Sequence, residues 1–201
     1  FEFVVGTGFA SAQGRAHVLD SVSGNQKIAL AVSFTDGSKG VVTGSIAPDG
    51  TVSGFDSSLV STGEEINKFN TGAPIVQGAT WSNSLFQKAG WDQTGKWFGF
   101  QAFLQSGTYP GGLVNSYNNS GLFIEVAPGE TILQVREGEQ AAGASAGVTY
   151  KDFYELSLGD NPAQYAFYAD LRGPEGACTA GRAGEASAGL RAVKSRYGYP
   201  S

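Results

Sequence analysis

Residues 26–50 read QKIALAVSFTDGSKGVVTGSIAPDG, and this stretch indicates the fold. From Gln26 to Phe34, bulky apolar residues alternate with small ones, which predicts a β-strand with one bulky and one small face. The pair Asp36-Gly37 predicts a hairpin turn, and 40–46 supplies the returning strand. Pro48-Asp49-Gly50 predicts the next turn, because proline presets φ and glycine accepts a positive φ. Antiparallel strands joined by tight turns are therefore expected here.

Further strand candidates follow, separated by turn residues at intervals of roughly ten residues, a spacing typical of barrels and sandwiches. They cover residues 51–59, 75–77, 80–87, 96–105, 121–126, 131–137, 164–171 and 190–197. Residues 149–156 fit a helix or a strand nearly equally well.

The expected fold is mainly β. An antiparallel β-barrel or sandwich occupies 1–139. Residues 140–147, QAAGASAG, are small and uncharged, and they predict either a flexible linker or a snug pass across another surface. Residues 148–201 are expected to form a C-terminal β-hairpin extension. Because so short a stretch buries little surface alone, we expect it to dock on another surface.

Composition narrows the function classes. The 201 residues carry a net charge of -5 with scattered basic residues, so nucleic acid is not an expected partner. No apolar run approaches the roughly 18 residues of a membrane span, so direct membrane insertion is not expected. The chain has no methionine and begins at Phe1, which favours a mature form whose targeting segment has been removed.

Groups that carry catalysis are sparse. His17 is the sole histidine, and its spacing favours a strand-face position over a catalytic one. The pairs Glu64-Glu65 and Glu137/Glu139 are expected to be solvated charge, and no cluster of histidine and cysteine predicts zinc. We therefore expect a protein that is not an enzyme, with a β-barrel hydrolase that uses His17 as a remote alternative.

Aromatic residues concentrate between Trp81 and Phe103, where all three tryptophans lie. They predict either the filling of a β-core or an exposed platform that stacks on a sugar or another planar ring. The platform interpretation defines the main functional alternative, a carbohydrate-binding β-sandwich of the lectin type.

The C-terminal stretch carries an ordered set of motifs. Residues 164–173 read QYAFYADLRG, Cys178 follows, then GRAG at 181–184 and AVKS at 192–195. This order resembles the opening of the cryptophyte phycobiliprotein α subunit, in which a strand ends in Asp-x-Arg-Gly. Similar motifs occur in red-algal phycobilisome scaffold proteins of the core-associated rod linker type. With a β-domain before it, this chain looks more like such a scaffold than like a free α subunit.

The resemblance implies contact with bilins or phycobiliproteins through one set of residues. They are Tyr165, Phe167, Tyr168, Asp170, Arg172, Gly173 and Arg182. Arginine forks at 172, 182 or 191 suit the propionates of a bilin, and aromatic rings suit its face. Cys178 corresponds to a bilin attachment point, although four residues separate it from Gly173, whereas in the α subunits the cysteine follows directly. Simpler roles stay open: a turn-stabilising Asp170–Arg172 pair, and tyrosines on the buried face of a hairpin.

The function expected on this basis is a non-enzymatic scaffold, or linker, of a phycobilisome light-harvesting antenna in photosynthesis. Its partners would be phycobiliprotein subunits and other phycobilisome linkers. It would need no cofactor of its own, and would contact phycoerythrobilin or phycocyanobilin carried by those subunits. The expected location is the plastid, on the stromal face of the thylakoid membrane, after a transit peptide has been removed.

Overall fold

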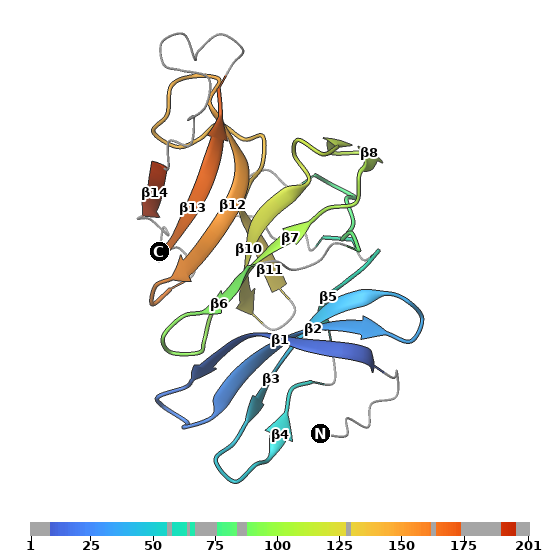
Figure 1. The fold of residues 1–201 in the computed structure, drawn as a ribbon, viewed down its shortest axis with the longest axis vertical. Coiled ribbons are helices and arrows are strands. Elements are labelled where there is room, and N and C mark those ends of the chain that lie inside the picture. The colour runs from blue at the N-terminus through green and yellow to red at the C-terminus, as the bar shows by residue number, and fades with distance from the viewer. Residues whose placement is uncertain are drawn as a thin grey trace.

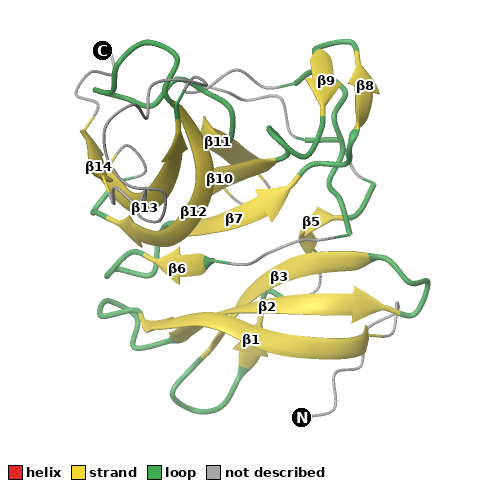
Figure 2. Cartoon of the chain, turned by 45° about the horizontal axis from the view of Figure 1, so that its top comes forward, coloured by secondary structure: helices red, strands yellow, loops and turns green. Residues whose placement is uncertain are grey.

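The computed structural model describes residues 9–55, 58–63, 65–66, 76–83, 88–127, 130–161, 164–173 and 190–195. Over these residues the strands form three antiparallel sheets and one small hairpin, and no helix occurs (Figure 2). The expected mainly β, antiparallel fold is confirmed. The sheets do not close on themselves, so of the two expected architectures the fold is sandwich-like rather than a barrel.

Sheet 1 has the order β1-β2-β3-β4, with β5 paired to β3. Its strands are β1 (Phe9–Leu19), β2 (Gln26–Phe34), β3 (Lys39–Ile46), β4 (Val52–Ser53) and β5 (Ser58–Ser61). The two expected turns are present, since Gly37 and Gly50 have φ of 85° and 86°.

The two faces of β2 divide as the alternation predicts. Ala29 on the small face is fully buried and belongs to the core shared with sheet 2. The bulky face forms a separate cluster with Val42 and Phe55, whose ring lies over Gly44. Small residues on the inner face therefore let sheet 1 approach sheet 2 closely.

Sheet 2 lies in the middle of the molecule and has the order β11-β10-β7-β6 (Figure 1). Its strands are β6 (Ala89–Trp91), β7 (Phe98–Phe103), β10 (Ser120–Ala127) and β11 (Glu130–Arg136). The buried Asp92 organises the turn before β7. Its carboxylate accepts the backbone N–H groups of Lys96 and Trp97 at 2.8 and 2.7 Å.

Sheet 3 has the order β12-β13-β14 and stands beside sheet 2 (Figure 1). Its strands are β12 (Thr149–Leu158), β13 (Gln164–Arg172) and β14 (Leu190–Ser195). The segment 149–156 is thus a strand, and the expected return strand over 190–197 is present in its described part, 190–195. The remaining hairpin consists of β8 (Gly107–Tyr109) and β9 (Gly112–Val114).

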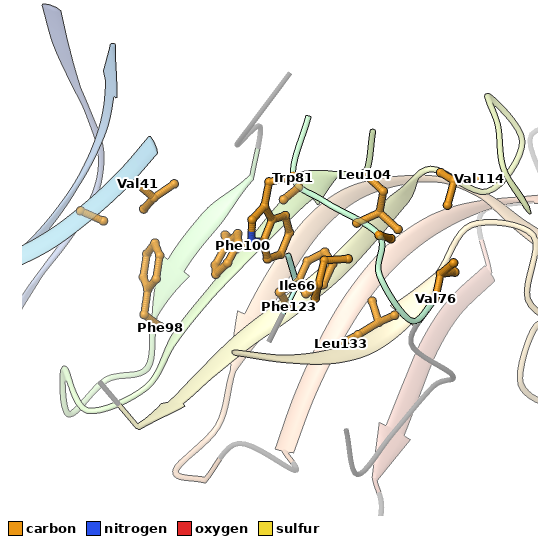
Figure 3. Packing of buried hydrophobic residues seen from close by; sticks show 13 residues of the cluster. Val41, Ile66, Val76, Trp81, Phe98, Phe100, Leu104, Val114, Phe123 and Leu133 are labelled. Carbon is orange, nitrogen blue, oxygen red and sulfur yellow. The ribbon is translucent and has the colours of Figure 1, made fainter. Parts of the chain in front are cut away.

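Two apolar cores hold the layers together, one on each face of sheet 2. The first lies against sheet 1, and Figure 3 shows Trp81 beside Phe100 and Phe123, with Val41 and Phe98 at one end. The Trp81 and Phe123 ring centroids are 4.6 Å apart in an edge-on arrangement. The second core joins β10 and β11 to β12 and β13. The C-terminal hairpin therefore shares its core with sheet 2, and the domain boundaries expected from sequence stay a prediction.

Residues 140–147 form a hydrogen-bonded loop. The side-chain amide of Gln140 donates to the carbonyl of Ser145 at 3.0 Å and accepts from the N–H of Gly147 at 2.9 Å. The N–H of Ala142 donates to the hydroxyl of Tyr150 at 3.0 Å, and Ala141 is buried. These contacts hold the loop together and join it to β12, and the two interpretations of this segment stay predictions.

Three expected strands differ from the structure in their described parts. The candidate 51–59 is interrupted, because Gly54 and Phe55 lie in a bend and a turn between β4 and β5. Val76 and Gln77 lie in a turn, closed by a hydrogen bond from the Ala79 N–H to the Val76 carbonyl. In the candidate 80–87, only Thr80 and Trp81 make isolated bridges, and 84–87 lie outside the described residues. Val76 and Trp81, from the candidates 75–77 and 80–87, are both buried in the first core, although neither belongs to a regular strand. Their apolar character reflects this burial.

Candidate functional site

The alternation of β12 and β13 separates a buried face from an outer face. The side chains that pack on sheet 2 are Tyr150, Phe153, Tyr165, Phe167 and Ala169. The outer face of sheet 3, as defined here, comprises Asp152, Tyr154, Tyr168, Asp170 and Arg172, which are exposed or half-buried.

This division splits the predicted contact set. Tyr165 and Phe167 are 8% and 3% exposed, so they fill the core, as the simpler alternative expected. Tyr168, Asp170 and Arg172 lie together on or beside the outer face, and Gly173 follows them as an exposed residue. Two more predicted positions, Cys178 and Arg182, lie outside the described residues. Arg191 belongs to β14, where its backbone lies opposite Tyr168.

A β-bulge positions Tyr154, a residue outside the predicted contact set. The pairing of β12 with β13 shifts register between Phe153 and Glu155, and a bulge of this kind redirects the extra side chain. The Tyr154 hydroxyl donates a hydrogen bond of 2.7 Å to the Asp170 carboxylate. Its ring centroid lies 5.6 Å from that of Tyr168. The hydrogen bond to Asp170 is the main reason that the pKa of Tyr154 rises to about 12.

Two carboxylates face each other across the strands. Asp152 of β12 is the register partner of Asp170 of β13, an arrangement of like charges that costs stability by itself. The Tyr154 hydroxyl on Asp170 and the Lys151 ammonium 3.5 Å from Asp152 offset part of that cost. The outer face of sheet 3 thus presents the carboxylate acceptors of Asp152 and Asp170 beside the rings of Tyr154 and Tyr168.

Arg172 connects this face to the end of β11. Its guanidinium lies 4.8 Å from the centre of the Tyr117 ring and 3.8 Å from the Glu137 carboxylate. Stacking on an aromatic ring and pairing with a carboxylate both restrict the side chain. The predicted local pair of Arg172 with Asp170 is not among the ion pairs of the described residues, where Arg172 pairs with Glu137.

The expectation that Glu137 is solvated charge is wrong. Only 6% of the residue is exposed, because the chain after β11 runs along β12 and Arg172 closes over it. Burial, followed by repulsion from Asp152, raises the pKa of Glu137 from 4.5 to about 7. Nothing in the local sequence signals this burial, since the residues responsible lie far away along the chain.

Three members of the predicted aromatic platform belong to the core, and a fourth, Phe86, lies outside the described residues. Trp81, Phe98 and Phe100 are at most 2% exposed, so the core interpretation is confirmed for them. Trp97 is half-buried and donates its indole N–H to the Asp160 carbonyl at 3.2 Å. His17 is an exposed residue of β1, opposite Ile28, which confirms its expected position on a strand face.

The described residues limit the chemistry of the site. They contain no group of three or more His, Cys, Asp or Glu side chains suited to a metal ion. Nor do they include a helix long and apolar enough to cross a membrane. What the outer face of sheet 3 offers is a pair of tyrosine rings, carboxylate acceptors and one guanidinium held by its neighbours.

Comparisons of this chain with protein-family models, with curated proteins and with solved structures find no match.

Proposed function

We propose that this chain is a non-enzymatic scaffold that binds a partner protein through the outer face of sheet 3. The observation that carries the proposal is the Tyr154–Asp170–Tyr168 group, in which Tyr154 is exposed and the other two residues are half-buried. A hydrogen bond and a ring contact hold the group in place. Tyrosine and arginine are the residue types that contribute most binding energy at protein interfaces. Their fixed positions lower the entropy cost of binding.

The rigidity of the support favours the same role. The inner face of sheet 3 packs on sheet 2 through a core that includes Tyr150, Phe153 and Phe167. Within sheet 3, the ring centroids of these three residues lie 5.5 to 5.9 Å apart. A partner bound on the outer face would thus be fixed relative to the rest of the chain. A scaffold needs this property, because its task is to set the geometry of what it binds.

The resemblance of residues 164–195 makes phycobiliprotein subunits the first partner to test. In that case Tyr168 and Asp170 would contact the subunit near its bilin, and Arg172 would border the contact. The mechanism would be geometric: the scaffold would hold pigment-bearing subunits in register and adjust the surroundings of their bilins through packing and charge.

Titration of the full chain into purified phycobiliprotein, followed by calorimetry and by the bilin absorption band, tests the proposal. We expect Tyr168→Ala and Asp170→Asn each to weaken binding at least about tenfold, the usual effect of losing an interface hot spot. Matched controls are Leu113→Ala, an exposed apolar residue of β9, and Asp49→Asn in the exposed β3–β4 turn.

Two results would contradict the proposal. Absence of binding by the wild-type chain would remove phycobiliproteins as partners. Equal weakening by the control variants would show that the outer face of sheet 3 is not the contact surface.

A further inference from the structure

Glu137 lies where sheet 2 passes into sheet 3. Directly after it, the N–H of Gly138 donates to the Tyr150 carbonyl at 2.9 Å, and the N–H of Tyr150 donates to the Glu139 carbonyl at 3.0 Å. A bridge between Gln140 and Thr149 continues the pairing. We name these contacts the β11–β12 junction. They tie the C-terminal hairpin to the central sheet by backbone hydrogen bonds, in addition to the shared core.

The charges that face Glu137 come from three strands. Asp152 of β12 repels its carboxylate, whereas Arg172 of β13 and Arg136 of β11 attract it. The Arg172 contact is long, at 3.8 Å, and this guanidinium also lies over the Tyr117 ring. Arg136 directs its Nε–H to the Asn118 carbonyl at 2.6 Å. Neither arginine makes a short ion pair with the buried carboxylate.

The neighbouring polar groups add little to the stabilisation of an ionised Glu137 carboxylate. The Glu137 N–H donates to the Ser120 carbonyl, and the Ser120 hydroxyl accepts from the side-chain amide of Gln101. A carboxylate with 7% side-chain exposure and one long ionic contact is poorly stabilised when ionised, whereas its neutral acid fits the same site at lower cost.

We propose that protonation of Glu137 controls how tightly the β11–β12 junction is held, so that the junction opens more readily as the pH rises through neutrality. When the carboxyl is neutral, the closed junction holds no buried carboxylate charge beside Asp152. When the proton leaves, opening hydrates the carboxylate and separates it from Asp152. This inference concerns the junction alone and does not depend on the proposed function.

The direction of the pH effect follows from linkage. The pKa of Glu137 is about 7 in the closed structure and near 4.5 once the side chain is hydrated. The closed state therefore binds the proton more strongly than the open state. Its extra stability is fully present below about pH 4.5 and is lost as the pH rises through about 7.

Amide hydrogen exchange of the full chain, measured by NMR at Gly138 and Tyr150, reports opening directly. After correction for the intrinsic exchange rate, we expect protection of both amides to fall at least about tenfold between about pH 5 and pH 8. The isosteric Glu137→Gln variant should lose this dependence and stay protected, because it mimics the neutral acid. The control Glu155→Gln, at an exposed glutamate of β12, should behave as the wild type does.

A second measurement distinguishes the protonation of Glu137 from an effect of the substitution on folding. The carboxyl carbon of Glu137 should titrate near pH 7, and Asp152→Asn should lower that midpoint by removing the like charge. A Glu137 midpoint near 4.5, or a Glu137→Gln variant with the same pH-dependent protection as the wild type, would overturn the inference.

Discussion

Replacing Asp92 by alanine should destabilise the protein by removing the acceptor that organises the β6–β7 turn. The residue is fully buried, and Oδ1 accepts the backbone N–H groups of Lys96 and Trp97 at 2.8 and 2.7 Å. Oδ2 accepts the N–H and the hydroxyl of Thr94, an exposed residue whose donors water can satisfy after the substitution. The lost stability therefore comes mainly from the two hydrogen bonds to Oδ1.

At about 1.5 kcal/mol for each hydrogen bond to a charged acceptor, Asp92→Ala should cost about 3 kcal/mol. For a chain of this length that corresponds to a drop in Tm of roughly 6–12 °C by differential scanning calorimetry. Asp92→Asn keeps one acceptor oxygen, so its loss of stability should be about half that of Asp92→Ala. Asp49→Ala, in an exposed turn, is the control and should have a much smaller effect. A drop of less than about 2 °C for Asp92→Ala would refute the reasoning.

Three further substitutions probe other parts of the fold. Gly44→Ala would place a Cβ 2.6 Å from the Ser53 carbonyl oxygen, and thermal unfolding should show a loss of about 1–3 kcal/mol. Phe167→Ala empties part of the core between sheets 2 and 3, and urea unfolding should show a loss of about 3–5 kcal/mol. Tyr154→Phe should remove from an alkaline absorbance titration the tyrosine that ionises near pH 12. In the wild type, the stability that its bond to Asp170 adds should be present below pH 10 and lost towards about pH 12.

Local patterns were sufficient to predict the parts of the fold that depend on local chemistry. The strand Gln26–Phe34 and the turns at Gly37 and Gly50 follow from alternation and from the need for a positive φ. The hairpin β8–β9 was not predicted, because strands of three residues contain too little alternation to be recognised. Residues 149–156 looked ambiguous because the bulge at Tyr154 interrupts the two-residue period of β12.

The candidate site was predictable only in part. Tyr168, Asp170 and Arg172 were selected from their motif, and they do lie close together on or beside one face. The same motif also selected Tyr165 and Phe167, which β alternation directs into the core. The burial of Glu137 depends on its contacts with β12 and β13, and these become visible only once the sheets have been assembled.

The measurement that tests the central claim most directly follows the native protein, by antibody, through a gentle density gradient of lysate from the cells that make it. The scaffold account predicts that the protein sediments with a large coloured antenna complex. It further predicts that the Tyr168→Ala variant, expressed in its place and shown to be folded, is displaced to the top of the gradient. A wild-type protein that stays free and colourless while the antenna complexes are intact would contradict the account.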